Sequence, residues 1–182
     1  MFKRIKLFKY YLILGLQKTY RASGITSVCK DDMHILLWDF DKVKSVKKEL
    51  IPNLKKLQKQ FNLSNIYLFC SSPRKYHAYC LKKHNFHDMF RIIRLTPFTD
   101  DNFLIYTARR MEATLRISPK KGHKPVFIQC MPSKTKGSGS SAHREFLKKL
   151  IPNSNKLFNK ETLNWDNDYR LIFTEYDTGE QK

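Results

Sequence analysis

Acidic residues are scarce in this chain of 182 residues, which has 16 Asp and Glu against 35 Lys and Arg and a formal net charge of +19. This imbalance indicates polyanionic partners. Nucleic acid is the first candidate, because counterion release from phosphates drives sequence-independent binding, and an anionic membrane surface is the weaker one. Hydrophobic residues make up 41% of the chain, enough for the core of one domain, and aromatic residues make up 13%, offering faces on which unpaired bases can stack.

Several familiar patterns are also missing. The four cysteines form no CxxC pair, so we expect neither a structural zinc nor a disulfide framework. Residues 137–141 lack the GxxxxGK[ST] order of a Walker motif and are better interpreted as part of a mobile surface loop. No HxH occurs, which argues against a replication initiator that nicks DNA through a tyrosine and an HxH metal site.

No apolar run approaches the length of a membrane span. Because nucleic acid is favoured over an anionic membrane surface, no membrane partner is expected. The start of the chain is basic and then apolar, but no small-residue cleavage site follows, so we expect a cytoplasmic protein. A mitochondrial presequence stays open as an alternative, because the first acidic residue is Asp31.

Hydrophobic patterning predicts an α+β fold in a single domain over residues 1–182. Helices are expected at 43–61 and 84–95, with a kink or a new start near Pro52, because proline disrupts a helix interior but suits a first turn. Strands are expected at 35–41, 65–70, 76–81, 103–107, 113–118 and 126–131. This β-α-β-β-α-β order, followed by further strands, predicts an RRM-like sheet with helices on one face.

The regions flanking this core, which covers about residues 33–131, are less regular. Residues 10–16 suit either a strand or a short buried helix, and 25–28 suit a short strand. A flexible polar loop is expected at 132–141. The C-terminal extension, 142–182, is predicted to contain a short basic helix at 142–150 and an edge strand within 169–176.

The strand at 35–41 ends in two carboxylates. Asp39 and Asp41 are spaced i, i+2, so they point to the same face, where they repel each other unless water or a cation lies between them. A hard divalent metal with oxygen ligands is the usual cation. The alternative is a strand that ends in solvated aspartates before a helix.

The turn between the next two strands gathers hydroxyls, cations and an imidazole. This combination suits a triphosphate, whose oxygens accept charge-assisted hydrogen bonds, or equally a nucleic-acid backbone. The residues are Ser71, Ser72, Arg74, Lys75 and His77.

Segments 37–41, 71–79 and 100–110, in this order, resemble the three motifs of the archaeo-eukaryotic primase superfamily, particularly its primase-polymerase branch. The first is an apolar strand ending in DxD, and the second is a turn ending in SxH. The third is an aspartate shortly before a Tyr-Thr-x-x-Arg strand. Residues 115–122 are similar to the segment that ends in a basic turn in these enzymes. The resemblance covers roughly residues 33–130.

The chain departs from the family pattern in three respects. Lys75 occupies the position of the SxH serine, so a hydroxyl role would pass to Ser71 or Ser72. The third acid is Asp100 or Asp101, with Asp101 favoured because it lies nearer the predicted strand at 103–107. No zinc-binding or helicase module is present, which makes a separate helicase or replication initiator a candidate partner.

The resemblance implies a DNA primase or primase-polymerase, a template-dependent nucleotidyltransferase that makes primers on single-stranded DNA or RNA from nucleoside triphosphates. Asp39, Asp41 and Asp101 would hold two Mg²⁺ or Mn²⁺ ions. The nucleotide would be bound by Ser72, Lys75, His77, Arg116 and Lys121. The template or primer backbone would be bound by Arg74, Arg109, Arg110, Lys120 and Lys124.

Composition alone supports a second hypothesis. A non-catalytic protein that binds RNA or single-stranded DNA, such as a ribosome-associated scaffold or an inactive primase relative, would show the same charge and aromatic content. For each basic residue assigned above, a solvated surface cation is an equally good interpretation.

Overall fold

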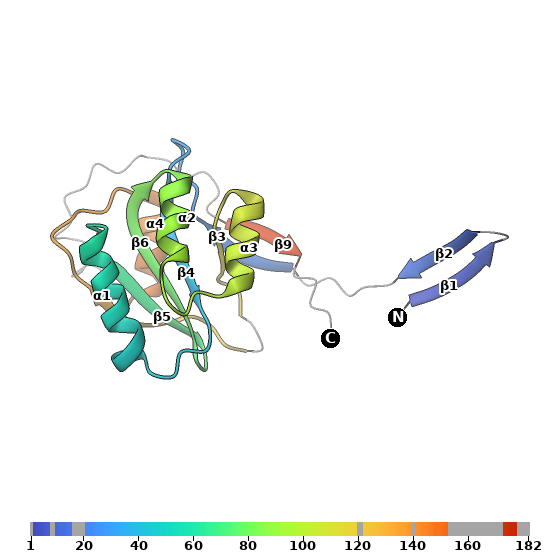
Figure 1. Cartoon of the computed structure of the whole chain (residues 1–182), viewed down its shortest axis with the longest axis horizontal. Coiled ribbons are helices and arrows are strands. Elements are labelled where there is room, and N and C mark those ends of the chain that lie inside the picture. The colour runs from blue at the N-terminus through green and yellow to red at the C-terminus, as the bar shows by residue number, and fades with distance from the viewer. Residues whose placement is uncertain are drawn as a thin grey trace.

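The computed structural model describes residues 2–7, 10–15, 21–119, 122–139, 141–152 and 173–177 (Figure 1). Within these residues the fold is α+β, as predicted, with four α-helices, a short π-helix and antiparallel sheets. No helix in these ranges is long and apolar enough to cross a membrane.

The central element is a four-stranded antiparallel sheet with the order β4-β6-β5-β8. Its four strands confirm the strands predicted at 35–41, 65–70, 76–81 and 126–131. The first three of these form the β4–β5–β6 unit that carries the candidate site. The four strands are β4 (His34–Phe40), β5 (Ile66–Ser72), β6 (Lys75–His84) and β8 (Val126–Met131). In β4 the residues from His34 to Trp38 are all buried, which explains the continuous apolar run in the sequence.

Two smaller sheets complete the β-structure. One pairs β1 (Phe2–Leu7) with β2 (Tyr10–Gly15), so the ambiguous segment at 10–16 is a strand. The other has the order β7-β3-β9. Its strands are β3 (Arg21–Thr26), β7 (Thr114–Arg116) and β9 (Phe173–Asp177), and β9 is the edge strand expected near the C-terminus.

The predicted helix at 43–61 is present in two parts. The π-helix η1 (Val46–Leu50) leads directly into α1 (Ile51–Gln60), and Pro52 lies in the first turn of α1, where its missing N–H costs nothing. Helices α2 (Phe86–Arg94) and α4 (Ser141–Leu150) also agree with the predictions. Asn85 caps α2 by accepting a hydrogen bond from the Asp88 N–H.

The prediction of a strand at 103–107 is wrong. These residues lie in α3 (Asp101–Arg110), which begins at an N-cap formed by Asp100 and ends at Met111 in the left-handed conformation. The Asp100 carboxylate accepts a hydrogen bond of 2.8 Å from the Phe103 N–H, satisfying one of the free donors of the first turn. Tertiary packing and capping therefore override the strand-like composition of this run.

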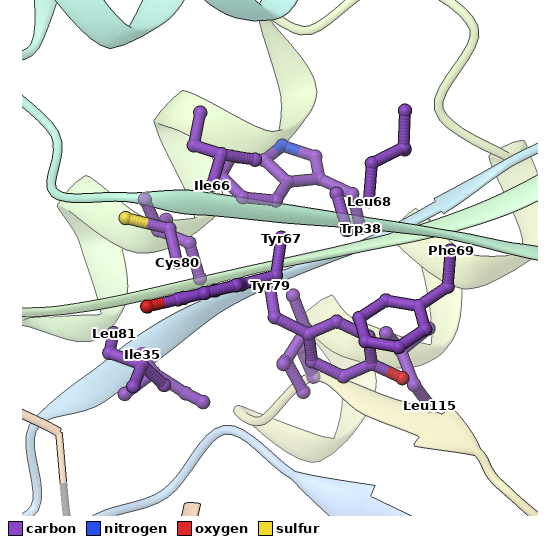
Figure 2. Packing of buried hydrophobic residues seen from close by; sticks show 14 of the residues in the cluster. Ile35, Trp38, Ile66, Tyr67, Leu68, Phe69, Tyr79, Cys80, Leu81 and Leu115 are labelled. Carbon is purple, nitrogen blue, oxygen red and sulfur yellow. The ribbon is translucent and has the colours of Figure 1, made fainter. Parts of the chain in front are cut away.

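Both faces of the four-stranded sheet are covered, so the prediction of helices on one face is wrong, because α4 packs on the face opposite to α1 and α2. Trp38, Ile66 and Leu68 lie on the face toward α1 and α2, whereas Ile35, Leu81 and Leu115 lie on the other side (Figure 2). On the first face the Trp38 Nε1–H donates to Thr96 just beyond α2, at 3.0 Å. On the second face Tyr79 contacts Phe146 of α4, with ring centroids 6.0 Å apart.

Part of the predicted surface loop is packed into the structure. The Ser138 N–H donates to the Leu81 carbonyl at 2.8 Å, and Gly137 and Gly139 are buried. A Cβ atom on Gly139 would lie 3.0 Å from a methyl of Ile35, so only glycine fits without displacement. Residues 137–139 therefore run along β6 rather than over the surface.

Candidate functional site

The two predicted carboxylates lie at the end of β4, at an edge of the four-stranded sheet. Asp39 is the penultimate residue of β4 and Asp41 follows its last residue. Their side chains are partly accessible, 36% and 25% exposed respectively. They therefore occupy a transition from buried strand to solvent, where an ion with a partial hydration shell can be bound.

A second segment, residues 98–100, lies along the free edge of β4. The Asp41 N–H donates to the Phe98 carbonyl at 3.0 Å, and the Asp100 N–H donates to the Asp39 carbonyl at 2.9 Å. An antiparallel bridge joins Phe40 to Thr99 between these two bonds. The main chain thus brings Asp100 next to Asp39, although they are far apart in the sequence.

Asp100 and Asp101 differ in what their side chains do. The Asp100 carboxylate caps α3 through the Phe103 N–H. Asp101 is the exposed first residue of the helix. The reason for favouring Asp101, its nearness to a strand at 103–107, is wrong because no strand exists there; the backbone contact with Asp39 belongs to Asp100.

Strand β6 places a histidine beside Asp39. In the antiparallel register Asp39 lies opposite His77, and the His77 Nε2 is 3.7 Å from the Asp39 Oδ1. The His77 side chain is only 8% exposed, and its Nδ1 has no hydrogen-bond partner among the residues described. His77 therefore faces the carboxylates from inside the protein, and solvent reaches it poorly.

Lys75 contacts the other carboxylate. Its Nζ donates to the Asp41 Oδ2 at 3.1 Å, with the lysine side chain 52% exposed. Burial raises the pKa of Asp41, but hydrogen bonds from Lys75 and from the Lys42 N–H outweigh this effect, so the pKa lies below its ordinary value. The ammonium group shows that a cation fits against Asp41.

Burial lowers the pKa of His77 to about 4. At neutral pH the imidazole is therefore uncharged, and its contact with Asp39 is not an ion pair. A neutral imidazole can donate a hydrogen bond from one nitrogen and accept one at the other. His77 is thus suited to orienting a carboxylate or a bound group rather than to supplying positive charge.

The other predicted nucleotide-binding residues are only partly brought together. Ser72 pairs with Lys75 across the hairpin, on β5, which is separated from the aspartates by β6. Arg74, predicted to bind the nucleic-acid backbone, is exposed in the same turn with a φ of 63°. Arg116 belongs to β7 in another sheet, and its guanidinium donates to the Ser118 hydroxyl and the Pro119 carbonyl. Lys121 lies outside the described residues.

The predicted backbone-binding cations are dispersed. Arg109 and Arg110 are exposed in the last turn of α3, and Lys124 is exposed before β8. Lys120 lies outside the described residues. Tyr106, the tyrosine of the Tyr-Thr-x-x-Arg segment, lies in α3 rather than in the predicted strand, and no binding role was predicted for its ring. The available signal was its position four residues before Arg110, which in a helix places the two side chains side by side.

The arrangement brings together two carboxylates, an ammonium group, an imidazole and a third aspartate on the adjacent main chain. In the described part of the chain, no three His, Cys, Asp or Glu side chains are grouped closely enough to form a metal site. Asp39 and Asp41 are accessible oxygen donors of the type that Mg²⁺ and Mn²⁺ take. No protein-family model, curated protein or solved structure matches the chain.

Proposed function

We propose that the protein is a small primase or primase-polymerase of the archaeo-eukaryotic type, a template-dependent nucleotidyltransferase acting on single-stranded nucleic acid. The observation that carries the proposal is the meeting of three distant segments at one sheet edge. Asp39 lies in β4 and Asp41 directly follows this strand, His77 of β6 lies beside Asp39, and the Asp100 N–H donates to the Asp39 carbonyl.

The fold supports the proposal. The strands β4, β6 and β5 are adjacent in that order, and α1 connects β4 to β5 as in a β-α-β-β unit. We infer that this unit is the RRM-like core implied by the motifs, with 98–100 in place of a further full strand beside β4. The sheet thereby presents its acidic edge to solvent and keeps its faces for packing.

Each residue has a task in the proposed reaction. Asp39 and Asp41, with Asp100 or Asp101, would hold Mg²⁺ or Mn²⁺, which supplies Lewis-acid activation of a 3′-hydroxyl and neutralises charge on the leaving pyrophosphate. Lys75, Arg74 and Ser72 would bind the triphosphate by charge-assisted and neutral hydrogen bonds. His77 would hold the Asp39 carboxylate in position as a neutral hydrogen-bonding group.

The experiment is primer synthesis on single-stranded DNA with labelled nucleotides and Mn²⁺. Asp39→Asn and Asp41→Asn should each abolish synthesis, because they remove a metal-binding charge, while binding of single-stranded DNA stays equal or becomes tighter. Asp31→Asn is a matched control, because Asp31 pairs with Lys83 on the surface away from β4's acidic end. Synthesis by either Asn variant at the wild-type rate would refute the assignment.

A second candidate function is a non-catalytic nucleic-acid-binding protein with the cytoplasmic setting expected from the sequence. It is favoured by the lack of a three-residue metal group within the described ranges, together with the net charge of +19. A purified chain that binds oligonucleotides, but whose affinity for nucleoside triphosphates does not depend on Mn²⁺, would support this second function.

A further inference from the structure

The exposed side of α3 combines apolar, aromatic and cationic side chains. Ile105 is 47% exposed, Tyr106 is 54% exposed, and Met111, just beyond the helix, is 53% exposed. Arg109 and Arg110 are exposed in the last turn. Large apolar and aromatic groups at this level of exposure, clustered on one short helix, are typical of a binding surface rather than of a solvated face.

Tyr106 and Arg110 are already stacked. The Arg110 guanidinium lies 5.6 Å from the centroid of the Tyr106 ring, four residues earlier on the helix. No acidic side chain pairs with Arg109 or Arg110 in the part of the chain that the structure describes. Among the described residues, two cations without an acidic partner therefore lie on the same side of the helix as an exposed aromatic ring, with Arg110 over one face of that ring.

The position of this helix connects the surface to the candidate site. The N-terminal end of α3 is attached to β4 through Asp100 and Asp39, and ten residues of helix extend about 15 Å from there to the arginines. A strand whose terminus lies at the carboxylates can follow the helix, with a base on Tyr106 and phosphates on the two arginines.

We propose that Tyr106, Arg109 and Arg110 form a stacking surface for single-stranded nucleic acid. Base–aromatic stacking tolerates any sequence, and arginines beside the ring supply both cation–π contact and phosphate binding. A protein partner is the competing occupant, since Tyr and Arg are also common anchors of protein interfaces. The net charge of +19 and the two arginines, which have no acidic partner among the residues that the structure describes, favour the polyanion.

The inference depends on the nucleic-acid partner of the proposed function but not on its chemistry, so the test is made with EDTA present. Binding of a fluorescein-labelled oligothymidylate is measured by anisotropy at several salt concentrations. Tyr106→Ala should weaken binding by about 5- to 150-fold with an unchanged salt dependence, because a stacked base is lost but no phosphate contact. Tyr106→Phe should bind like the wild type.

The arginines should behave differently from the tyrosine. Arg109→Gln/Arg110→Gln should reduce the slope of log K against log salt by about 1.4, since each phosphate contact on a single strand contributes about 0.7. The matched charge control is Lys55→Gln/Lys56→Gln on α1, where both lysines are exposed. This control should reduce the slope by less than half as much.

Three results would overturn the inference: wild-type affinity in Tyr106→Ala, an equal loss on blunt duplex DNA, or an equal loss of slope in the lysine control. Thermal melting of each variant confirms folding, which exposed positions should not disturb. If the wild type makes no primers but Tyr106→Ala loses binding as expected, the proposed function fails and the stacking surface stands. If the wild type makes primers but Tyr106→Ala binds the oligonucleotide with wild-type affinity, the proposed function stands and the stacking surface fails.

Discussion

The buried imidazole of His77 makes a quantitative prediction about acid stability. Folding removes this group from water, which lowers its pKa from 6.5 to about 4. In the unfolded chain the same histidine takes up a proton near pH 6.5. Between these two values the unfolded state binds more protons than the folded state, so the stability conferred by neutral His77 falls as the pH falls.

The size of the effect follows from the difference in pKa. A difference of about 2.5 units corresponds to about 3 kcal/mol at full expression, below pH 4, at 1.36 kcal/mol per unit. From pH 7 to pH 5 the expected loss is about 2 kcal/mol. His34 and His84 also have lowered pKa values through burial, so other acid-sensitive terms add to this one.

The assay is urea unfolding followed by circular dichroism at pH 7 and pH 5, for the wild type and for His77→Leu. The variant should lose about 2 kcal/mol less than the wild type between the two pH values, because leucine binds no proton. His87→Gln, at an exposed position on α2, is the control and should keep the wild-type pH dependence. Equal losses in His77→Leu and the wild type would refute the assignment of a buried neutral imidazole.

Three further substitutions test the packing around the site by urea unfolding. Asp100→Ala should cost about 1 kcal/mol by removing the cap on the Phe103 N–H, whereas Asp100→Asn should be near neutral because it keeps the acceptor; equal costs would contradict capping. Gly139→Ala should cost about 1–3 kcal/mol, since its Cβ would lie 3.0 Å from Ile35; wild-type stability would contradict the close approach. Gln58→Met should cost about 2 kcal/mol or more, because two buried carbonyls lose the donor that now reaches them at 2.9 and 3.0 Å; a smaller cost would show that water replaces it.

The sequence was sufficient for the elements with strong periodicity. In these segments the hydrophobic pattern is clear enough to indicate the secondary structure. They are the apolar run of β4, the hairpin of β5 and β6, and the helically spaced apolar residues of α1 and α2. The effect of Pro52 was also predictable, because proline tolerates only the first turn of a helix. These elements are determined mainly by which side chains must be buried.

Helix α3 shows where this reasoning fails. Phe103 to Thr107 is rich in aromatic and β-branched residues, which favours a strand when the run is considered alone. The opposing signals lie at its ends: Asp100 is a capping residue, Asp101 suits the positive end of the helix dipole, and Arg109 and Arg110 suit the negative end. Taken together, these flanking residues favour the helix.

The sequence predicts which residues belong to the candidate site better than it predicts the contacts between them. Alternation places Asp39 and Asp41 on one face, but their partners depend on the register between β4 and β6, two strands that are far apart in the sequence and joined through α1 and β5. That register is what sets His77 opposite Asp39 and brings Lys75 to Asp41. Long-range pairing of this kind, like the placement of 98–100, is not encoded in local periodicity.

The hydrogen bonds between β4 and residues 98–100 involve only peptide groups. The spacing between the Asp39 and Asp100 α-carbons is therefore a property of the polypeptide scaffold and is insensitive to which side chains those positions carry. Asp39 can therefore be exchanged for other ligand-bearing residues without removing these bonds, whereas a replacement for Asp100 must also keep an acceptor for the Phe103 N–H. The edge of β4 is in this sense a ready-made template for engineering new donor sets.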